Sequence, residues 1–165
     1  MMNRALSIMS TKALLVLLES GEAGSKSAAI ICSSHEIDHN RLSRLPVLCL
    51  RFDDTENAFS RRAFSHEMAR QIVRFVDELP QHVQALYVTC DSGESRSAAI
   101  AAAVLSGSGQ SDMIIWKNPK YRPNSLVYRY VREAYSLPVT HAELLQRTAI
   151  NEEALRYCIA QARKT

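Results

Sequence analysis

The sequence has little of what several large functional classes require. Its formal net charge of +3 over 165 residues is too small to indicate binding to nucleic acid. The apolar run near the N-terminus, Ala13–Leu18, ends at Glu19 and is too short for a signal peptide or a membrane span. There is no internal repeat and no low-complexity tract. These absences predict one cytoplasmic domain over residues 1–165, with no nucleic-acid or membrane partner.

The cysteines show no spacing typical of a metal site. They stand at positions 32, 49, 90 and 158, whereas zinc sites usually place two ligands about two to four residues apart. Three of them lie in apolar surroundings, which indicates free thiols in a reducing compartment.

One literal match to a metal motif occurs at His35–His39, which fits the zinc-peptidase pattern H-E-x-x-H. In that motif two histidines one helical turn apart bind zinc, and the helix needs an apolar face. Here the segment is polar, and Leu42 and Leu45 replace the glycine and third histidine of a metzincin. We predict a solvated loop or a single turn and no metal site, which makes a zinc peptidase the least favoured function.

A strand, a short polar turn and a helix follow one another between Ala85 and Gly107. The apolar run Ala85–Thr89 ends at Cys90, and an alanine-rich helix follows the turn. The turn is Asp91, Ser92, Gly93, Glu94, Ser95 and Arg96. The first amides of a helix point outward without internal partners, and converging loop amides form a concave site for an anion. Because a guanidinium binds phosphate oxygens in a bidentate manner, Arg96 makes phosphate the predicted ligand.

Cys90 adds a nucleophile to this predicted phosphate site. A helix N-terminus and a guanidinium both favour the thiolate form of a cysteine. The hydroxyl of Ser97 can donate a hydrogen bond to the sulfur and later help it to leave. The spacing Cys90-x5-Arg96-Ser97, with Gly93 inside it, resembles the CX5R phosphate-binding loop of the cysteine-dependent protein tyrosine and dual-specificity phosphatases. Small bacterial and phage members are the most similar.

This resemblance covers residues 47–137 and implies both a fold and an activity. The fold is an α/β three-layer sandwich, with a central, mostly parallel sheet of about four strands flanked by helices and with extra C-terminal helices over 138–165. The activity is hydrolysis of a phosphomonoester through a cysteinyl-phosphate, without metal or cofactor. The implied substrate is a phosphorylated protein, most simply a phosphotyrosine, or a small phosphomonoester.

The resemblance also implies a general-acid aspartate on a loop a few dozen residues before the cysteine. Asp53 and Asp54 directly follow the apolar run Val47–Phe52. Parallel strands bring such residues to the same sheet edge as Cys90. We favour Asp54, because Asp53 is nearer the strand and more readily used in backbone caps.

Two features depart from the family pattern, and one further segment agrees with it. Thr89 stands where a histidine usually precedes the nucleophile, which predicts a less acidic Cys90 and a slower enzyme. Asp91 and Glu94 add negative charge to the loop, which disfavours substrates with several phosphates. Asn124 resembles an asparagine that follows the phosphate loop and supports it.

Hydrophobic periodicity and capping residues predict the other elements. Ser10 and Gly21 bound one expected helix, and Thr140 with Glu143 makes a capping box for another. The expected strands are Arg4–Met9, Ala28–Cys32, Val47–Phe52 and Ala85–Thr89. The expected helices are Thr11–Ser20, a helix capped by Ser65 that reaches Leu79, the helix after Cys90, Asn124–Leu137, and two more in 138–165. In the last of these, the pattern from Ala154 to Ala162 predicts a buried stripe.

Two other functions share this loop. A sulfurtransferase also uses a cysteine in an amide-lined loop, although its loop is typically about one residue shorter and needs no upstream acid. A non-catalytic phosphate-binding module would use the same amides and arginine without a working acid.

Overall fold

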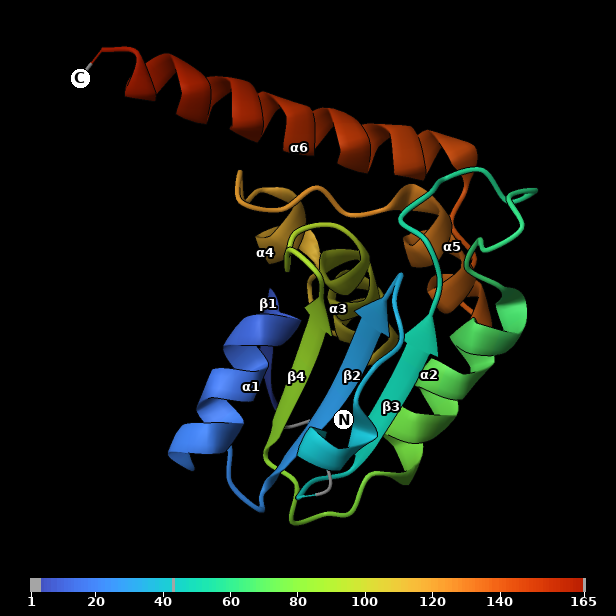
Figure 1. The fold of residues 1–165 in the computed structure, drawn as a ribbon. Helices are drawn as coiled ribbons and strands as arrows, with labels where there is room; N and C mark the ends of the chain where they lie inside the picture. The colour runs from blue at the N-terminus through green and yellow to red at the C-terminus, as the bar shows by residue number, and fades with distance from the viewer. Residues whose placement is uncertain (1–3, 43, 165) are drawn as a thin grey trace.

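The computed structural model describes residues 4–42 and 44–164, and within them the chain forms one parallel sheet of four strands between two layers of helices (Figure 1). The strands are β1 (Ala5–Ser10), β2 (Ser27–Ser33), β3 (Val47–Arg51) and β4 (Ala85–Cys90). Their order in the sheet is β1-β4-β2-β3, and every pair is parallel. The predicted three-layer α/β fold is confirmed.

Helices cover both faces of the sheet. They are α1 (Thr11–Ser20), the short 3₁₀ helix η1 (His39–Leu42), α2 (His66–Glu78), α3 (Arg96–Gly107), α4 (Met113–Trp116), α5 (Ser125–Ala134) and α6 (His141–Ala162). Helix α1 and η1 pack on one face, and α2, α3 and α5 pack on the other. Helix α6 crosses α4 and α5 at the end of the molecule where the strands finish (Figure 1).

Strand β2 shows why the sheet is buried on both sides. Ala28 and Ile30 pack toward α3, whereas Ala29 and Ile31 pack toward α1. All of its residues are buried, as expected for a continuous apolar run in a parallel sheet covered by helices on both faces.

The register brings the carboxyl ends of the strands to a common edge. Ser10 of β1 pairs with Cys90 of β4, and Ile31 of β2 pairs with Thr89. Strand β4 lies between β1 and β2, so the crossover through α2 that joins β3 to β4 passes over β2. Cys90 therefore ends an inner strand, at the sheet edge where α/β proteins bind ligands.

The capping residues recognised in the sequence cap their helices. Ser10 accepts a hydrogen bond from the Ala13 amide at the start of α1, and Gly21 ends that helix with a left-handed φ of 79°. Ser65 accepts from the Met68 amide in the same way. At the start of α6, Thr140 and Glu143 form the predicted capping box.

The C-terminal region differs from the expectation. It forms the single 22-residue helix α6 instead of two helices, because no glycine or proline interrupts it. The amide of Asn151 ties α6 to the carbonyls of Trp116 and Tyr121. Beyond Asn151 the helix is not buried, so the predicted stripe is wrong: Cys158 and Ile159 are exposed.

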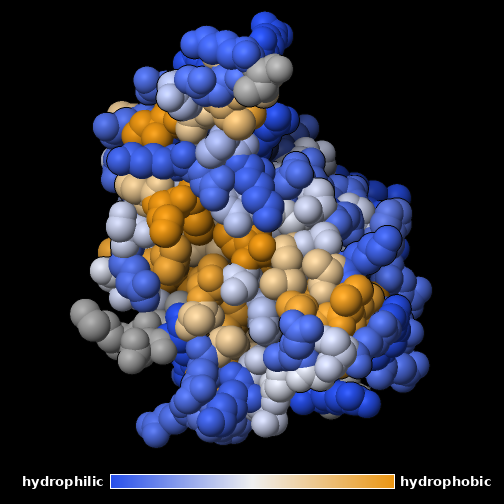
Figure 2. All heavy atoms as spheres, turned by 90° about the vertical axis from the view of Figure 1, so that its left-hand side faces the viewer, coloured by the Kyte–Doolittle hydropathy of each residue, from blue (hydrophilic) through white to orange (hydrophobic). Residues whose placement is uncertain are grey.

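The β1 edge of the sheet carries an apolar surface. Figure 2 shows hydrophobic side chains gathered on this side of the molecule. A groove of about 590 Å³ runs there between β1 and α4, with Leu6, Ile8 and Ile114 among its lining residues. Among the described residues, no helix has the length and apolar character that crossing a membrane requires.

Candidate active site

The turn after β4 closes around the sulfur of Cys90. The cysteine is 1% exposed, and the Gly93 amide donates a hydrogen bond to its Sγ at 3.3 Å. The Ser97 Oγ, in the first turn of α3, lies 3.1 Å from the same sulfur. The strand–turn–helix predicted from the sequence is thus present, with the thiol at the centre of the turn.

These contacts favour the thiolate. Burial alone would raise the pKa of Cys90, but the hydroxyl and amide of Ser97 and the amides of Gly93 and Glu94 donate to the sulfur, and the net pKa is lowered. Neutral donors therefore make the main lowering contributions. A lowered pKa increases the share of thiolate, which is the form in which a cysteine is nucleophilic.

Gly93 seats the turn on the first strand. Its φ is 77°, a conformation that other residues rarely adopt. A Cβ at this position would lie 2.5 Å from the carbonyl carbon of Met9 and 2.6 Å from the amide nitrogen of Ser10. Because both atoms belong to the backbone, only glycine allows the turn to rest on the junction of β1 and α1.

Thr89, the residue before Cys90, makes contacts with the start of α1. Its Oγ1 lies 3.1 Å from the Oγ1 of Thr11, and Thr11 donates in turn to the carbonyl of Cys90 at 3.3 Å. The residue before the nucleophile is thus linked to the first residue of α1. Thr11 was not identified from the sequence, where it read only as a helix N-terminal residue.

Arg96 is held by groups from three parts of the chain. Its side chain is 5% exposed. The Nη1 donates to the carbonyl of Phe52 at 2.8 Å and to the Oγ of Ser34 at 3.0 Å. The Nη2 donates to Asp91 Oδ2 at 2.5 Å. Among the described residues the buried Nε has no hydrogen-bond partner.

Asp54 and Asp53 take different positions. Asp54 Oδ1 accepts from the Oγ of Ser95, in the turn after Cys90, at 2.9 Å and from the Nδ2 of Asn124 at 2.8 Å. Asp53 instead pairs with Arg62 at 3.2 Å, at the base of the loop between β3 and α2. Of these two aspartates, Asp54 is the one with a hydrogen bond to the turn.

The loop that carries Asp54 is attached to the start of α5. Asn124 caps α5 through its Oδ1 and donates through its Nδ2 to Asp54 and to the carbonyl of Thr55. Glu56 accepts from both the amide and the hydroxyl of Ser125. Asn124 therefore contacts the aspartate loop directly. Its backbone N–H also donates to the Ser95 carbonyl at 3.4 Å.

The remaining predicted residues of the turn, Ser92 and Glu94, are exposed on its rim. The Glu94 carbonyl accepts a hydrogen bond from the Arg122 amide at 2.9 Å.

The segment that matches the metal motif is mostly not helical. Residues 34–38 form no helix, and His39 begins η1. Within the described part of the chain, no three histidine, cysteine or carboxylate side chains are grouped to hold a metal ion.

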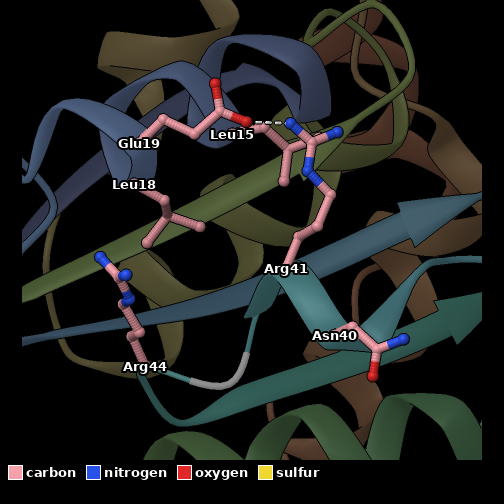
Figure 3. Close-up of a pocket in the computed structure, with 6 residues that line it drawn as sticks. All are labelled: Leu15, Leu18, Glu19, Asn40, Arg41 and Arg44. Atoms are coloured by element: carbon pink, nitrogen blue, oxygen red, sulfur yellow. Dashed lines mark hydrogen bonds and ion pairs between the residues drawn. The ribbon is translucent and has the colours of Figure 1, made fainter.

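A hollow of about 370 Å³ between α1 and η1 is separate from this site (Figure 3). Leu15, Leu18, Asn40 and Arg44 line it, and Arg41 crosses it to pair with Glu19. Glu19 lies near the C-terminal end of α1, whereas Thr11 at the other end contacts the Cys90 turn. The hollow is therefore remote from the thiol.

Solved structures show what this chain is similar to. The crystal structure of DUSP15 matches with a TM-score of 0.58 and 16% identity, over 93% of this chain and 94% of that chain. The PTP-2 phosphatase of Cydia pomonella matches with a TM-score of 0.51 and 12% identity, over 90% of this chain and 86% of that chain. No protein-family model and no curated protein matches the sequence. The chain has the fold of the tyrosine and dual-specificity phosphatases.

We predict that Gly93→Ala abolishes oxyanion binding and lowers the free energy of unfolding by more than about 2 kcal/mol, because the new methyl group meets backbone and the positive φ adds strain. Gly109→Ala is the matched control: its φ of 75° is similar, but nothing lies within 4 Å of an added Cβ. Gly109→Ala should lower the free energy of unfolding by only about 1 kcal/mol and leave oxyanion binding intact. Urea unfolding and protection of Cys90 from iodoacetate by vanadate measure both effects. Equal behaviour of the two variants would contradict the proposed contact.

We further predict that Ser97→Ala raises the pKa of Cys90. The change removes the hydroxyl that donates to the thiolate, and burial then favours the thiol. The pH dependence of alkylation by iodoacetate measures the shift, since only the thiolate reacts. The midpoint should move to higher pH, and an unmoved midpoint would show that the backbone amides alone stabilise the thiolate.

Proposed function

We propose that this protein hydrolyses phosphomonoesters through a cysteinyl-phosphate intermediate. The observation that carries the proposal is the surrounding of Cys90: a thiol with a lowered pKa lies among amide donors, beside a buried arginine whose Nε has no partner in the described part of the chain. A phosphate bound in the turn would supply the missing acceptor. A buried donor without a partner is costly, so an anion at this position also stabilises the site.

In the first step the Cys90 thiolate attacks phosphorus in line with the leaving oxygen. The turn amides and Arg96 bind the other three phosphate oxygens, over which the negative charge is spread in the transition state. The protonated carboxyl of Asp54 gives its proton to the leaving oxygen as the P–O bond breaks. Such a proton transfer contributes roughly 10²–10⁴-fold to the rate.

In the second step a water molecule attacks the cysteinyl-phosphate. The Asp54 carboxylate now accepts a proton from that water, and the P–S bond breaks to release inorganic phosphate. Ser97 donates a hydrogen bond to the departing sulfur, for which its 3.1 Å distance from the thiol is suitable. The thiolate is regenerated without any metal ion or cofactor.

We propose a phosphotyrosyl protein, or another phosphomonoester without further phosphates, as the substrate class. Asp91 and Glu94 of the turn are exposed carboxylates, and Asp54 and Glu56 lie on the adjoining loop. A second phosphate next to these groups would be repelled. A single phosphate on a neutral or basic peptide avoids that repulsion.

The contacts of Asp54 favour hydrolysis over the two alternatives. A phosphate-binding module or a sulfurtransferase needs no carboxyl group at the turn, yet Asp54 accepts hydrogen bonds from Ser95 and Asn124. Turnover of p-nitrophenyl phosphate compared with thiosulfate separates the candidates. A module would turn over neither compound.

The first test of the reaction uses p-nitrophenyl phosphate with a chelator present. Cys90→Ser should abolish turnover but still bind vanadate, because the amides and Arg96 remain. Arg96→Lys should lose at least about 10²-fold in kcat/KM, since an ammonium cannot reproduce two parallel hydrogen bonds. Undiminished turnover by Cys90→Ser would exclude the cysteinyl-phosphate mechanism.

The second test identifies the acid. Asp54→Asn should slow hydrolysis of alkyl phosphates by about 10²-fold or more, and should matter far less for p-nitrophenol, which leaves without protonation. Asp53→Asn is the matched control, because its carboxylate pairs with Arg62 outside the turn. The slope of log kcat against leaving-group pKa measures the effect. A steeper slope in Asp53→Asn alone would assign the role to the other aspartate.

A further inference from the structure

The hydrogen-bond donors of Arg96 can be counted one by one. A guanidinium has five N–H groups: two on each Nη and one on Nε. Phe52 and Ser34 take both hydrogens of Nη1, and Asp91 takes one hydrogen of Nη2. With respect to the residues that the structure describes, the hydrogens left are the one on Nε and the second on Nη2, and two N–H groups suffice for bidentate binding of a phosphate.

Asp91 is itself fixed from a second direction. The Oγ of Ser33, at the end of β2, donates to Asp91 Oδ1 at 3.2 Å and accepts from the His35 amide at 3.0 Å. Asp91 Oδ2 accepts from Arg96 at 2.5 Å. The side chain of Asp91 is 45% exposed and that of Arg96 5%. The carboxylate thus joins a buried cation to the end of a neighbouring strand.

We propose that Asp91 is a positioning residue for Arg96: it holds the guanidinium, before substrate binds, with Nε and one Nη2 hydrogen available to the phosphate. The inference rests on the proposed function, since it assigns a role within the same site. The two carboxylates of the turn are then not equivalent. Asp91 orients the arginine, whereas Glu94 contributes only charge at the rim.

This role has an electrostatic consequence. The negative charge of Asp91 offsets part of the arginine's positive charge, so it weakens binding of a phosphate dianion while it orients the groups that bind it. Orientation and charge can be separated by substitution. Asp91→Asn keeps an acceptor for Nη2 of Arg96 but removes the negative charge, and Asp91→Ala removes both the acceptor and the charge.

The experiment compares Asp91→Ala, Asp91→Asn and Glu67→Gln in kcat, KM and protection of Cys90 from iodoacetate by inorganic phosphate. Glu67→Gln is the control, because it breaks an exposed carboxylate–arginine pair with Arg70 on α2. Asp91→Ala should lose about tenfold or more in kcat/KM, much of it in kcat, since Nη2 then has no acceptor and the guanidinium is held only through Nη1. Asp91→Asn should keep kcat/KM within about threefold of the native value. It should bind inorganic phosphate more tightly than both Asp91→Ala and the native protein.

Equal losses of kcat/KM in Asp91→Ala and Asp91→Asn would overturn the proposal, because the loss would then come from removal of the charge alone. A loss of the same size in Glu67→Gln would also overturn it. The phosphate-protection measurement does not depend on turnover. The native protein could hydrolyse no phosphomonoester while Asp91→Asn still binds phosphate more tightly than Asp91→Ala. In that case the proposed function fails and the positioning role stands.

Discussion

The buried charge of Arg96 is the constraint on which the site depends. A guanidinium cannot be deprotonated in a protein, so a side chain that is 5% exposed must find acceptors wherever it is placed. The acceptors come from Phe52 after β3, Ser34 after β2 and Asp91 after β4. The arginine therefore requires three strand ends to meet at one point, and the parallel sheet supplies that meeting point.

The other side of the turn depends on β1. Gly93 rests on the backbone of Met9 and Ser10, and Thr11 contacts both Thr89 and the Cys90 carbonyl. All of these contacts are neutral, and Thr89 brings no positive charge to the residue before Cys90. The pKa of Cys90 is nevertheless lowered, because hydrogen bonds from Ser97 and the turn amides outweigh burial. A threonine at this position is thus compatible with a lowered cysteine pKa when the loop amides converge on the sulfur.

Much of this could be predicted from the sequence, because the signals are local. Ser10 and Gly21 bound α1 through capping chemistry, and the spacing from Cys90 to Arg96 defines the turn. Ser33 and Ser34 carry no such signal, since their role arises only from the pairing of β2 with β4. The stripe around Cys158 was misjudged for a related reason. Helical periodicity shows which residues share a face, but not whether the chain supplies anything to cover that face.

The attachment of the aspartate loop bears on how Asp54, the proposed acid, is presented. Asn124 caps α5 and binds Asp54 with the same side-chain amide, while Glu56 accepts from Ser125 at the same helix end. Moving this loop away from Ser95 would break the bonds of Asp54 to Asn124 and of Glu56 to Ser125, and the first turn of α5 would lose the Glu56 acceptor. The loop tip is different, because Phe59 is 98% exposed. The Asp54 end of the loop is therefore tied to the N-terminus of α5, and in the proposed reaction a substrate would meet a carboxyl group already in place. Closure of the whole loop over the substrate is not needed to bring Asp54 to the turn.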